Sequence, residues 1–324
     1  MSSPAHELRA AQIPDELSGE RVDKALARLF PQYSRSALQQ WLRQGLILVD
    51  DDIPAQKDKV HGGETVELVV PDAPALEEAA EDIPLQVIYS DEQILVLNKP
   101  AGLVVHPGAG NHSGTLMNGL LHFDPGARRL PRAGIVHRLD KDTTGLMVVA
   151  RSEPARLRLI EELAQRTMTR EYLALLHGDL ISGRTVDEPI GRHPRNRRLM
   201  AVRADGRSAV THFRVERRFG PLTLARCRLE SGRTHQIRVH ASHIGFPIVG
   251  DPLYGGTGRV PAGVSEALRE QVRAFGRQAL HAASLSLNHP ETGEVMTFTA
   301  PLPEDFSRLL QAVDEELGNG GRRG

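Results

Sequence analysis

A run of twelve residues, 135–146, limits most strongly what this chain can fold into. It places the polar loop His-Arg-Leu-Asp-Lys-Asp-Thr-Thr between an apolar pair and the apolar run 146–150, with Gly145 closing the loop. The apolar flanks predict two strands, and a polar loop held between rigid elements is a common position for functional side chains. Asp140 is therefore either a functional carboxylate or an ordinary turn residue, because Asp is also frequent in turns.

The length and composition describe a globular protein of ordinary type. The chain has 324 residues, enough for two domains, and is 40% hydrophobic and 25% charged. Cys227 is its single cysteine, which excludes an internal disulfide and is typical of a reducing, cytoplasmic setting. The chain has no run of 18 apolar residues, so we expect no membrane span. Residues 1–20 also lack the apolar core of a signal peptide.

The formal net charge of −1 hides a strong separation of charge along the chain. Residues 71–92 contain seven acidic residues and no Lys or Arg, whereas 184–238 contains fourteen arginines and five acidic residues. A phosphate backbone responds to the local charge, so the second segment can bind RNA although the total is near zero. A solvated basic surface without a partner is the alternative.

The N-terminal region has the pattern of two short helices and a hairpin. Apolar residues on one face predict a helix over 21–30, which Pro31 ends. A second helix begins at a cap on Ser34 or Ser36 and ends at Gly45. Short strands are predicted at 46–49 and 65–70.

The remainder mixes strands and helices without a regular strand–helix alternation, which favours an α+β fold over a doubly wound sheet. Two helices are predicted, one at 153–165 capped by Ser152 and one that Thr234 caps and that runs to 243. The predicted strands are 85–89, 94–98, 146–150, 171–176, 208–216 and 222–229.

Three further segments carry residue types suited to chemistry. In Gly-Arg-Thr-His-Gln-Ile-Arg-Val-His, 232–240, the histidines are five residues apart, which is poor spacing for a metal site on one helix face. Thr-Arg-Glu-Tyr, 169–172, offers a flat ring with a hydroxyl. The glycine-rich 97–118 lacks the Gly-Lys-Ser/Thr ending of a nucleoside-triphosphate loop. We therefore expect neither a metal nor a cofactor.

These four segments, in their order along the chain, resemble the motifs of the pseudouridine synthases, enzymes that isomerise uridine to pseudouridine within RNA. The resemblance implies a mixed, mainly antiparallel sheet flanked by helices. It also implies that Asp140 is the catalytic residue and that Arg238 pairs with it. Tyr172 would stack on the target base and is a candidate proton acceptor.

The same resemblance implies a set of substrate contacts. Arg138 would enter the RNA in place of the extracted base, and Ile237 would pack against that base. Arg233 is expected to contact a phosphate or the framework. His137 and Thr144, which belong to the His-Arg-Leu-Asp segment, are also expected at the substrate site.

Residues 18–75 resemble the S4 RNA-binding module, carried by 21–24, 34–35, 45–49 and 62–64. The basic residues expected to face RNA phosphates are Lys24, Arg35, Arg43 and Lys57. One departure concerns the hairpin turn, where the usual Asn-Gly is replaced by Asp50-Asp51, which adds negative charge near that face. The alternative is a small structural domain that binds no RNA.

Taken together, the motifs predict a monomer whose partner is large-subunit ribosomal RNA or an assembling large subunit. The sequence of residues 106–111 most resembles a branch of the family that modifies this RNA, and this resemblance implies the helix 69 stem-loop as the target. The expected domains are a flexible 1–17, an S4-like 18–75, an acidic linker 76–84, a catalytic 85–312 and a flexible tail 313–324.

Two other functions use the same residues differently. A non-catalytic RNA-binding or ribosome-assembly factor would not need Asp140, Tyr172 and Arg238 to be intact. A glycoside hydrolase would need a pair of carboxylates, and Asp142 is the only near neighbour of Asp140. Within the leading hypothesis, attack of Asp140 on C1′, attack on C6 and removal of a sugar proton all remain open.

Overall fold

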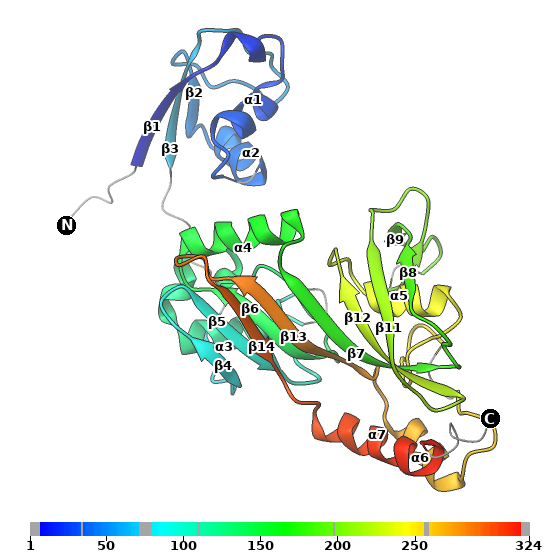
Figure 1. The fold of residues 1–324 in the computed structure, drawn as a ribbon. Coiled ribbons are helices and arrows are strands. Elements are labelled where there is room, and N and C mark those ends of the chain that lie inside the picture. The colour runs from blue at the N-terminus through cyan, green and yellow to red at the C-terminus, as the bar shows by residue number, and fades with distance from the viewer. Residues whose placement is uncertain are drawn as a thin grey trace. The chain divides into compact units, whose positions relative to one another are not determined.

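The computed structural model describes residues 7–33, 35–70, 79–108, 111–196, 198–255 and 259–318. The chain divides into two compact units, Met1–Ala75 and Leu76–Gly324, and each is described by itself (Figure 1). No helix in the described residues is long and apolar enough to cross a membrane.

The first unit is a three-stranded antiparallel sheet with two helices, joined by a core in which Leu26, Leu38, Ile47 and Leu68 are at most 1% exposed. This arrangement confirms the predicted helices and hairpin. Ser34, one of the two expected caps, lies outside the described residues. The elements are β1 (Glu7–Gln12), a 3-10 helix (Asp15–Leu17), α1 (Val22–Leu29), α2 (Arg35–Arg43), β2 (Ile47–Val49) and β3 (Thr65–Val70).

The expectation of a flexible segment over 1–17 is wrong for its described part. Strand β1 pairs with β3 along its whole length, from Glu7 opposite Val70 to Gln12 opposite Thr65. Leu8 is 62% exposed, so apolar burial does little to hold this edge strand. Backbone pairing with β3 holds it instead, and the side-chain pattern of the segment gives no sign of such pairing.

The unusual hairpin turn adopts the backbone that Asn-Gly would adopt. Asp50 and Asp51 have φ angles of 47° and 66°, in the left-handed region that two-residue hairpin turns require. Asp tolerates this region better than most residues, and Oδ1 of Asp50 also accepts a hydrogen bond from the Thr65 amide at 2.8 Å. The acidic pair therefore forms the turn without disturbing the sheet.

The second unit is built on a mixed sheet of nine strands within the described residues. Its order is β4-β5-β6-β13-β7-β12-β11-β8, with β14 also paired to β13, and all pairings except β6 with β13 are antiparallel. The predicted α+β class is thereby confirmed. The strands are β4 (Val87–Ser90), β5 (Ile94–Lys99), β6 (Thr144–Ala150), β7 (Thr169–His177), β8 (Arg184–Asp187), β11 (Val210–Arg218), β12 (Leu222–Leu229), β13 (Leu280–Asn288) and β14 (Val295–Thr299).

Helices and a small two-stranded ribbon flank this sheet (Figure 1). The ribbon pairs β9 (Ile190–Arg192) with β10 (Met200–Val202), and α6 and α7 lie side by side. The helices are α3 (Leu116–Phe123), α4 (Glu153–Gln165), α5 (Gln236–His243), α6 (Glu266–Ala274) and α7 (Glu304–Leu317), with 3-10 turns at Pro125–Arg129 and Pro131–Gly134.

The parallel pairing of β6 with β13 depends on Gly145. Its φ is +111°, and a Cβ at this position would lie 2.2 Å from the carbonyl oxygen of Ala282 on β13. A side chain cannot fit there, so only glycine allows β13 to approach the start of β6. The polar loop 137–143 immediately precedes this contact, and its end is therefore fixed to the centre of the sheet.

Two predicted flexible segments are ordered where they are described. In the expected linker 76–84, residues 76–78 lie outside the described residues, but Asn118 donates a hydrogen bond to the Ala79 carbonyl and Gly114 donates one to Glu81. In the expected tail 313–324, α7 continues to Leu317, because Phe306, Leu309 and Val313 form a buried stripe at helical spacing. Residues 319–324 lie outside the described residues.

Candidate active site

The His-Arg-Leu-Asp loop is anchored to the sheet at its first residue. Nε2 of His137 accepts a hydrogen bond from the Val148 amide on β6 at 3.0 Å. Burial lowers the pKa of His137 to about 3, so the ring is neutral and acts as an acceptor. The first of the two predicted strands is reduced to a single bridge between Ile135 and Val149.

A buried lysine holds the other end of the loop. Lys99, the last residue of β5, is 1% exposed, and its Nζ donates to the carbonyls of Pro100, Leu103 and Lys141 at 2.7, 2.9 and 2.8 Å. Burial lowers the pKa of Lys99 to about 7, although the charges of Asp142 and Asp140 oppose this. One side chain thus joins the glycine-rich segment after β5 to the loop that carries Asp140.

We expect Lys99→Met to lower the free energy of unfolding of the second unit by about 2–3 kcal/mol. Three buried carbonyl oxygens would lose their donor, and each unsatisfied group carries a desolvation penalty. Urea unfolding measures the effect, with Lys57→Met as the matched control because Lys57 is exposed in the first unit. A loss below about 0.5 kcal/mol would contradict this role of Lys99.

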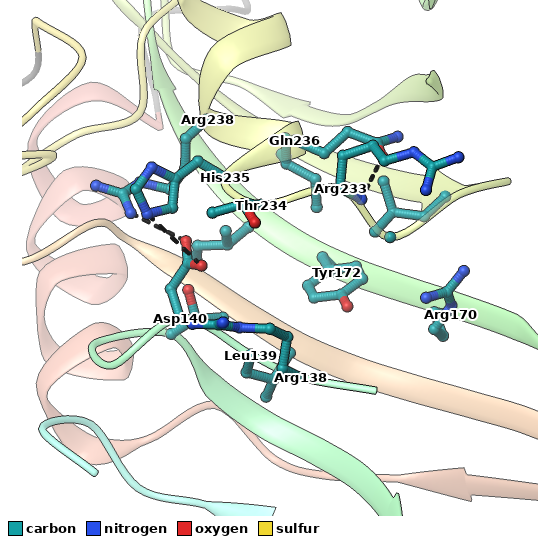
Figure 2. Close-up of a pocket in the computed structure, with 15 residues that line it drawn as sticks. Arg138, Leu139, Asp140, Arg170, Tyr172, Arg233, Thr234, His235, Gln236 and Arg238 are labelled. Carbon is teal, nitrogen blue, oxygen red and sulfur yellow. Dashed lines mark hydrogen bonds and ion pairs between the residues drawn. The ribbon is translucent and has the colours of Figure 1, made fainter. Parts of the chain in front are cut away.

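A narrow pocket opens beside the loop, between the ends of β7 and β12 and the start of α5 (Figure 2). Its cavity volume is about 50 Å³. A base can enter only after side chains at the rim move, and exposed Arg138 is one of them. Its lining includes six of the predicted site residues, namely Arg138, Asp140, Tyr172, Arg233, Ile237 and Arg238.

Asp140 and Arg238 form the charged centre of this pocket. Nη1 of Arg238 donates to Oδ2 of Asp140 at 2.9 Å, which is the pairing that the sequence predicted. The Asp140 side chain retains 16% exposure, whereas that of Arg238 retains only 4%. The carboxylate therefore reaches the pocket while its partner is buried behind it.

Asp251 fixes Arg238 from the other side. Its two oxygens accept from Nε and Nη2 of Arg238 at 2.7 and 2.8 Å, and the Tyr254 ring lies 5.1 Å from the guanidinium carbon. Burial alone would disfavour the cation, but the hydrogen bonds and charge of Asp251, together with Asp140, raise the pKa of Arg238. The guanidinium is thus permanently charged and locked in position.

His235 is a member of the site that the sequence did not predict. Its Nδ1 lies 2.7 Å from the Tyr254 hydroxyl, and its Nε2 lies 3.9 Å from Oδ1 of Asp140. Burial lowers the pKa of His235, which keeps the ring neutral at neutral pH, although nearby Asp140 opposes this. A neutral His235 leaves Arg238 as the cation that contacts Asp140.

The predicted cap of the α5 helix at Thr234 is wrong. The helix begins at Gln236 after His235, which has a left-handed φ of 58° and makes no side-chain cap. Oε1 of Gln236 instead accepts from the Arg233 amide and the Ser231 hydroxyl at 3.0 and 2.8 Å. Thr234 is consequently released to line the pocket.

Tyr172 forms the wall opposite Asp140 (Figure 2). The residue is 5% exposed and belongs to β7, where it pairs with Cys227 on one side and Ala282 on the other. Burial raises the pKa of the Tyr172 hydroxyl, so the phenol is neutral at neutral pH. The ring thus presents a flat apolar surface to the pocket.

Two predicted contacts lie outside the pocket. Thr144 is 2% exposed, and its hydroxyl lies 2.8 Å from Nδ1 of His281 in the interior, while the preceding Thr143 lines the pocket. Side chains of successive strand residues point to opposite faces, so an error of one position moved the expected contact into the core. His137 lines a neighbouring cavity and serves mainly as an anchor.

The predicted RNA contacts of the first unit are exposed, but two of them already have acidic partners, because Nζ of Lys24 lies 4.0 Å from Glu20 and Arg35 binds Asp23. Arg35 donates to buried Asp23 at 2.8 Å, together with Gln39 and Arg21. Burial raises the pKa of Asp23, but these hydrogen bonds outweigh it and lower the pKa to about 2. Lys24 and Arg43 present exposed charges.

Two family models match the chain. The model described as RNA pseudouridylate synthase matches residues 93–243, which include every pocket residue described above up to Arg238. The S4 domain model matches residues 20–66 in the first unit.

Similar proteins agree with these matches. A ribosomal large subunit pseudouridine synthase D of Xanthomonas campestris is 53% identical over 95% of this chain and 93% of its own length. The protein of the same name from Pseudomonas aeruginosa is 51% identical over 95% of this chain and 96% of its own length.

Solved structures extend the likeness to the fold. Human RNA pseudouridylate synthase domain containing 4 matches with a TM-score of 0.54 and 26% identity, over 70% of this chain and 92% of its own. Human RNA pseudouridylate synthase domain containing 1 matches with a TM-score of 0.52 and 26% identity, over 73% and 97%. With the identities above, they establish that this chain belongs to the RNA pseudouridylate synthase family and carries an S4 domain.

Proposed function

We propose that this protein converts specific uridines of large-subunit ribosomal RNA into pseudouridine, with the helix 69 stem-loop as its target. The observation that carries the proposal is the Asp140–Arg238 pair at the mouth of a pocket walled by Tyr172. The names of the relatives, which specify the ribosomal large subunit, support this choice of RNA.

In this proposal Asp140 is the reacting carboxylate. The N1–C1′ bond of uridine breaks, the uracil turns, and C5 bonds to C1′, while N1 gains a proton and C5 loses one. No atom or electron is added overall. Arg238 donates a hydrogen bond to Asp140 at 2.9 Å, and its positive charge faces the carboxylate as the base displaces water from the pocket.

Tyr172 and Arg138 divide the handling of the base. A paired uridine must leave its stack before C1′ is accessible, at a cost of a few kcal/mol. Exposed Arg138 can leave the narrow pocket and take the place of the base, stacking and pairing with phosphate as guanidinium groups do. The raised pKa of Tyr172 favours stacking over proton removal in the free protein, because its hydroxyl still holds its own proton.

The choice of RNA can be tested by mapping pseudouridines after incubation of the protein with unmodified large-subunit ribosomal RNA. We expect new pseudouridines in the helix 69 stem-loop and none in a transcript in which those uridines are replaced by cytidine. Modification elsewhere in the RNA with helix 69 untouched would contradict the proposed target and leave the enzyme class intact.

We propose that the first unit supplies RNA affinity through phosphate contacts. The double variant Lys24→Gln/Arg43→Gln is expected to weaken binding and to reduce the salt-dependence slope by about two, one for each lost contact. Filter binding over a salt series measures this slope, with Arg308→Gln, an exposed arginine on α7, as the control. An unchanged slope would show that these two residues do not meet the RNA.

A further inference from the structure

A second cavity adjoins the pocket. It has a volume of about 430 Å³, within the range of small-ligand sites, and lies between the 135–138 segment, the end of α4 and the turn after β12. The two cavities share the same boundary residues, Arg138, Arg170, Gly232 and Arg233. Three guanidinium groups therefore stand where one cavity passes into the other.

Arg170 is the most unusual of the three. It lies on β7 two residues before Tyr172, so both side chains belong to the same face of the strand. The residue is 6% exposed, and its buried Nε has no hydrogen-bond partner among the described residues. Burial accordingly lowers the pKa of Arg170. A buried cation without a counter-charge is costly, which indicates a place prepared for an anion.

The residues around the Arg170 guanidinium leave room for an anion. Glu230 is the one carboxylate in the described lining of the second cavity, and it is already bound by Arg166 at 2.6 Å and by His212 at 2.7 Å. A Cβ at Gly232 would lie 2.8 Å from Nη1 of Arg170, so glycine at this position gives the guanidinium its room. Figure 2 shows Arg170 and Arg233 beyond Tyr172, on the side away from Asp140.

We propose that Arg170, with Arg138 and Arg233, binds the phosphate that joins the target uridine to an adjacent nucleotide, and that the second cavity receives this neighbour. The inference rests on the proposed function, which places the uridine against Tyr172. An RNA strand that continues from the first pocket must carry its phosphodiester across the boundary, where a planar guanidinium is well suited to two phosphate oxygens.

The second cavity also holds a group suited to reading the neighbouring base. Nε2 of His106 is buried there and has no hydrogen-bond partner among the described residues. Burial lowers the pKa of His106 to about 4, with the charges of Arg132 and Arg138 acting in the same direction. A neutral imidazole can offer one donor or acceptor to a base edge, so His106 would favour one class of neighbour.

The phosphate contact can be tested by combining Arg170→Met with an RNA that carries a neutral methylphosphonate at the linkage on one side of the target uridine. For the wild-type protein, we expect a neutral linkage on one of the two sides to weaken binding by about 10- to 100-fold. For Arg170→Met, the all-phosphate RNA should bind as weakly, and the neutral linkage should cause no further loss.

Stability separates this role from a structural one. Because Arg170 has no anionic partner among the described residues, Arg170→Met should leave the thermal unfolding temperature unchanged or raise it. Arg158→Met, an exposed arginine on α4, is the matched control for RNA binding. Additive losses in the combined experiment, or full tolerance of neutral linkages on both sides by the wild-type protein, would overturn the inference.

The neighbour can be tested separately with RNAs that lack one base beside the target. Loss of the base on the side of the sensitive linkage should weaken wild-type binding and have less effect on His106→Ala. Equal sensitivity of the two proteins would remove His106 from the inference. Absence of any pseudouridine with intact RNA would instead contradict the proposed function, so the two failures are distinguishable.

Discussion

Changing Asp140 to asparagine is expected to lower the rate of pseudouridine formation by about 10⁴-fold or more. The RNA affinity should stay within about threefold of the wild-type value. The substitution keeps the shape of the side chain and can still accept from Arg238. In the proposed function, bond exchange requires the negative charge that this substitution removes, whereas RNA is bound through phosphate contacts elsewhere. Pseudouridine formed in a single turnover at saturating enzyme, together with filter binding, measures both quantities.

Asp142→Asn is the matched control for this experiment. Asp142 lies in the same loop but is absent from the described pocket lining. It should retain activity within about tenfold, because it acts only through the loop. An Asp140→Asn enzyme that still forms pseudouridine at a rate near that of the wild type would show that another group carries the reaction.

The second large effect is expected for Arg238→Met, which should lower the free energy of unfolding by about 3–5 kcal/mol and also abolish activity. Asp251, whose side chain is fully buried, would lose its two hydrogen bonds from Arg238 and the positive charge that faces it. Asp140 would simultaneously lose the guanidinium that donates a hydrogen bond to its carboxylate. Urea unfolding and single-turnover kinetics measure the two losses.

A double variant separates the two consequences of losing Arg238. Arg238→Met/Asp251→Asn removes the buried negative charge of Asp251, while the amide oxygen of the new side chain can still accept from the Leu253 and Tyr254 amides, so about 2 kcal/mol of stability should return. Activity should not return, because Asp140 still lacks its partner. Recovery of activity with stability would mean that Arg238 acts only on the fold.

The contact between Asp140 and Arg238 could be predicted from the sequence because each residue lies in a contiguous motif. Asp140 and Arg238 are far apart in the chain, yet resemblance to one family assigned them to the same site, and the structure places them 2.9 Å apart. Asp251 lies outside the four motifs. Its contact with Arg238 depends on how the chain returns after α5, and no local pattern expresses that return.

His235 and Arg170 escaped prediction for a different reason. His235 reaches the pocket because its backbone is left-handed, a conformation that is uncommon outside glycine and that Thr-His-Gln does not suggest. Arg170 is notable only because its buried Nε has no hydrogen-bond partner in the described part of the chain, which is a property of the folded state. The errors at Thr144 and Thr234 arose because the face on which a side chain lies and the residue at which a helix begins can each change over one or two positions.

The two ends of the chain show what the periodicity of apolar residues can and cannot predict. Strand β1 is held by backbone pairing to β3 and exposes Leu8, so its side chains carry little signal. In contrast, α7 buries Phe306, Leu309 and Val313 at helical spacing, a signal that was present but that the expected tail from 313 overlooked. An edge strand such as β1 can therefore be predicted only from its pairing in the folded chain. The end of α7 could have been predicted by following the apolar periodicity over a longer stretch of sequence.

The most direct test of the central claim uses large-subunit ribosomal RNA with tritium at C5 of every uridine. Incubated with the wild-type protein, this RNA should release one tritium for each pseudouridine found in its nucleoside digest, with no free uracil. Release of free uracil would indicate glycoside hydrolysis. Bound RNA that loses no tritium would indicate a binding factor, and either result would contradict an isomerase that acts through Asp140.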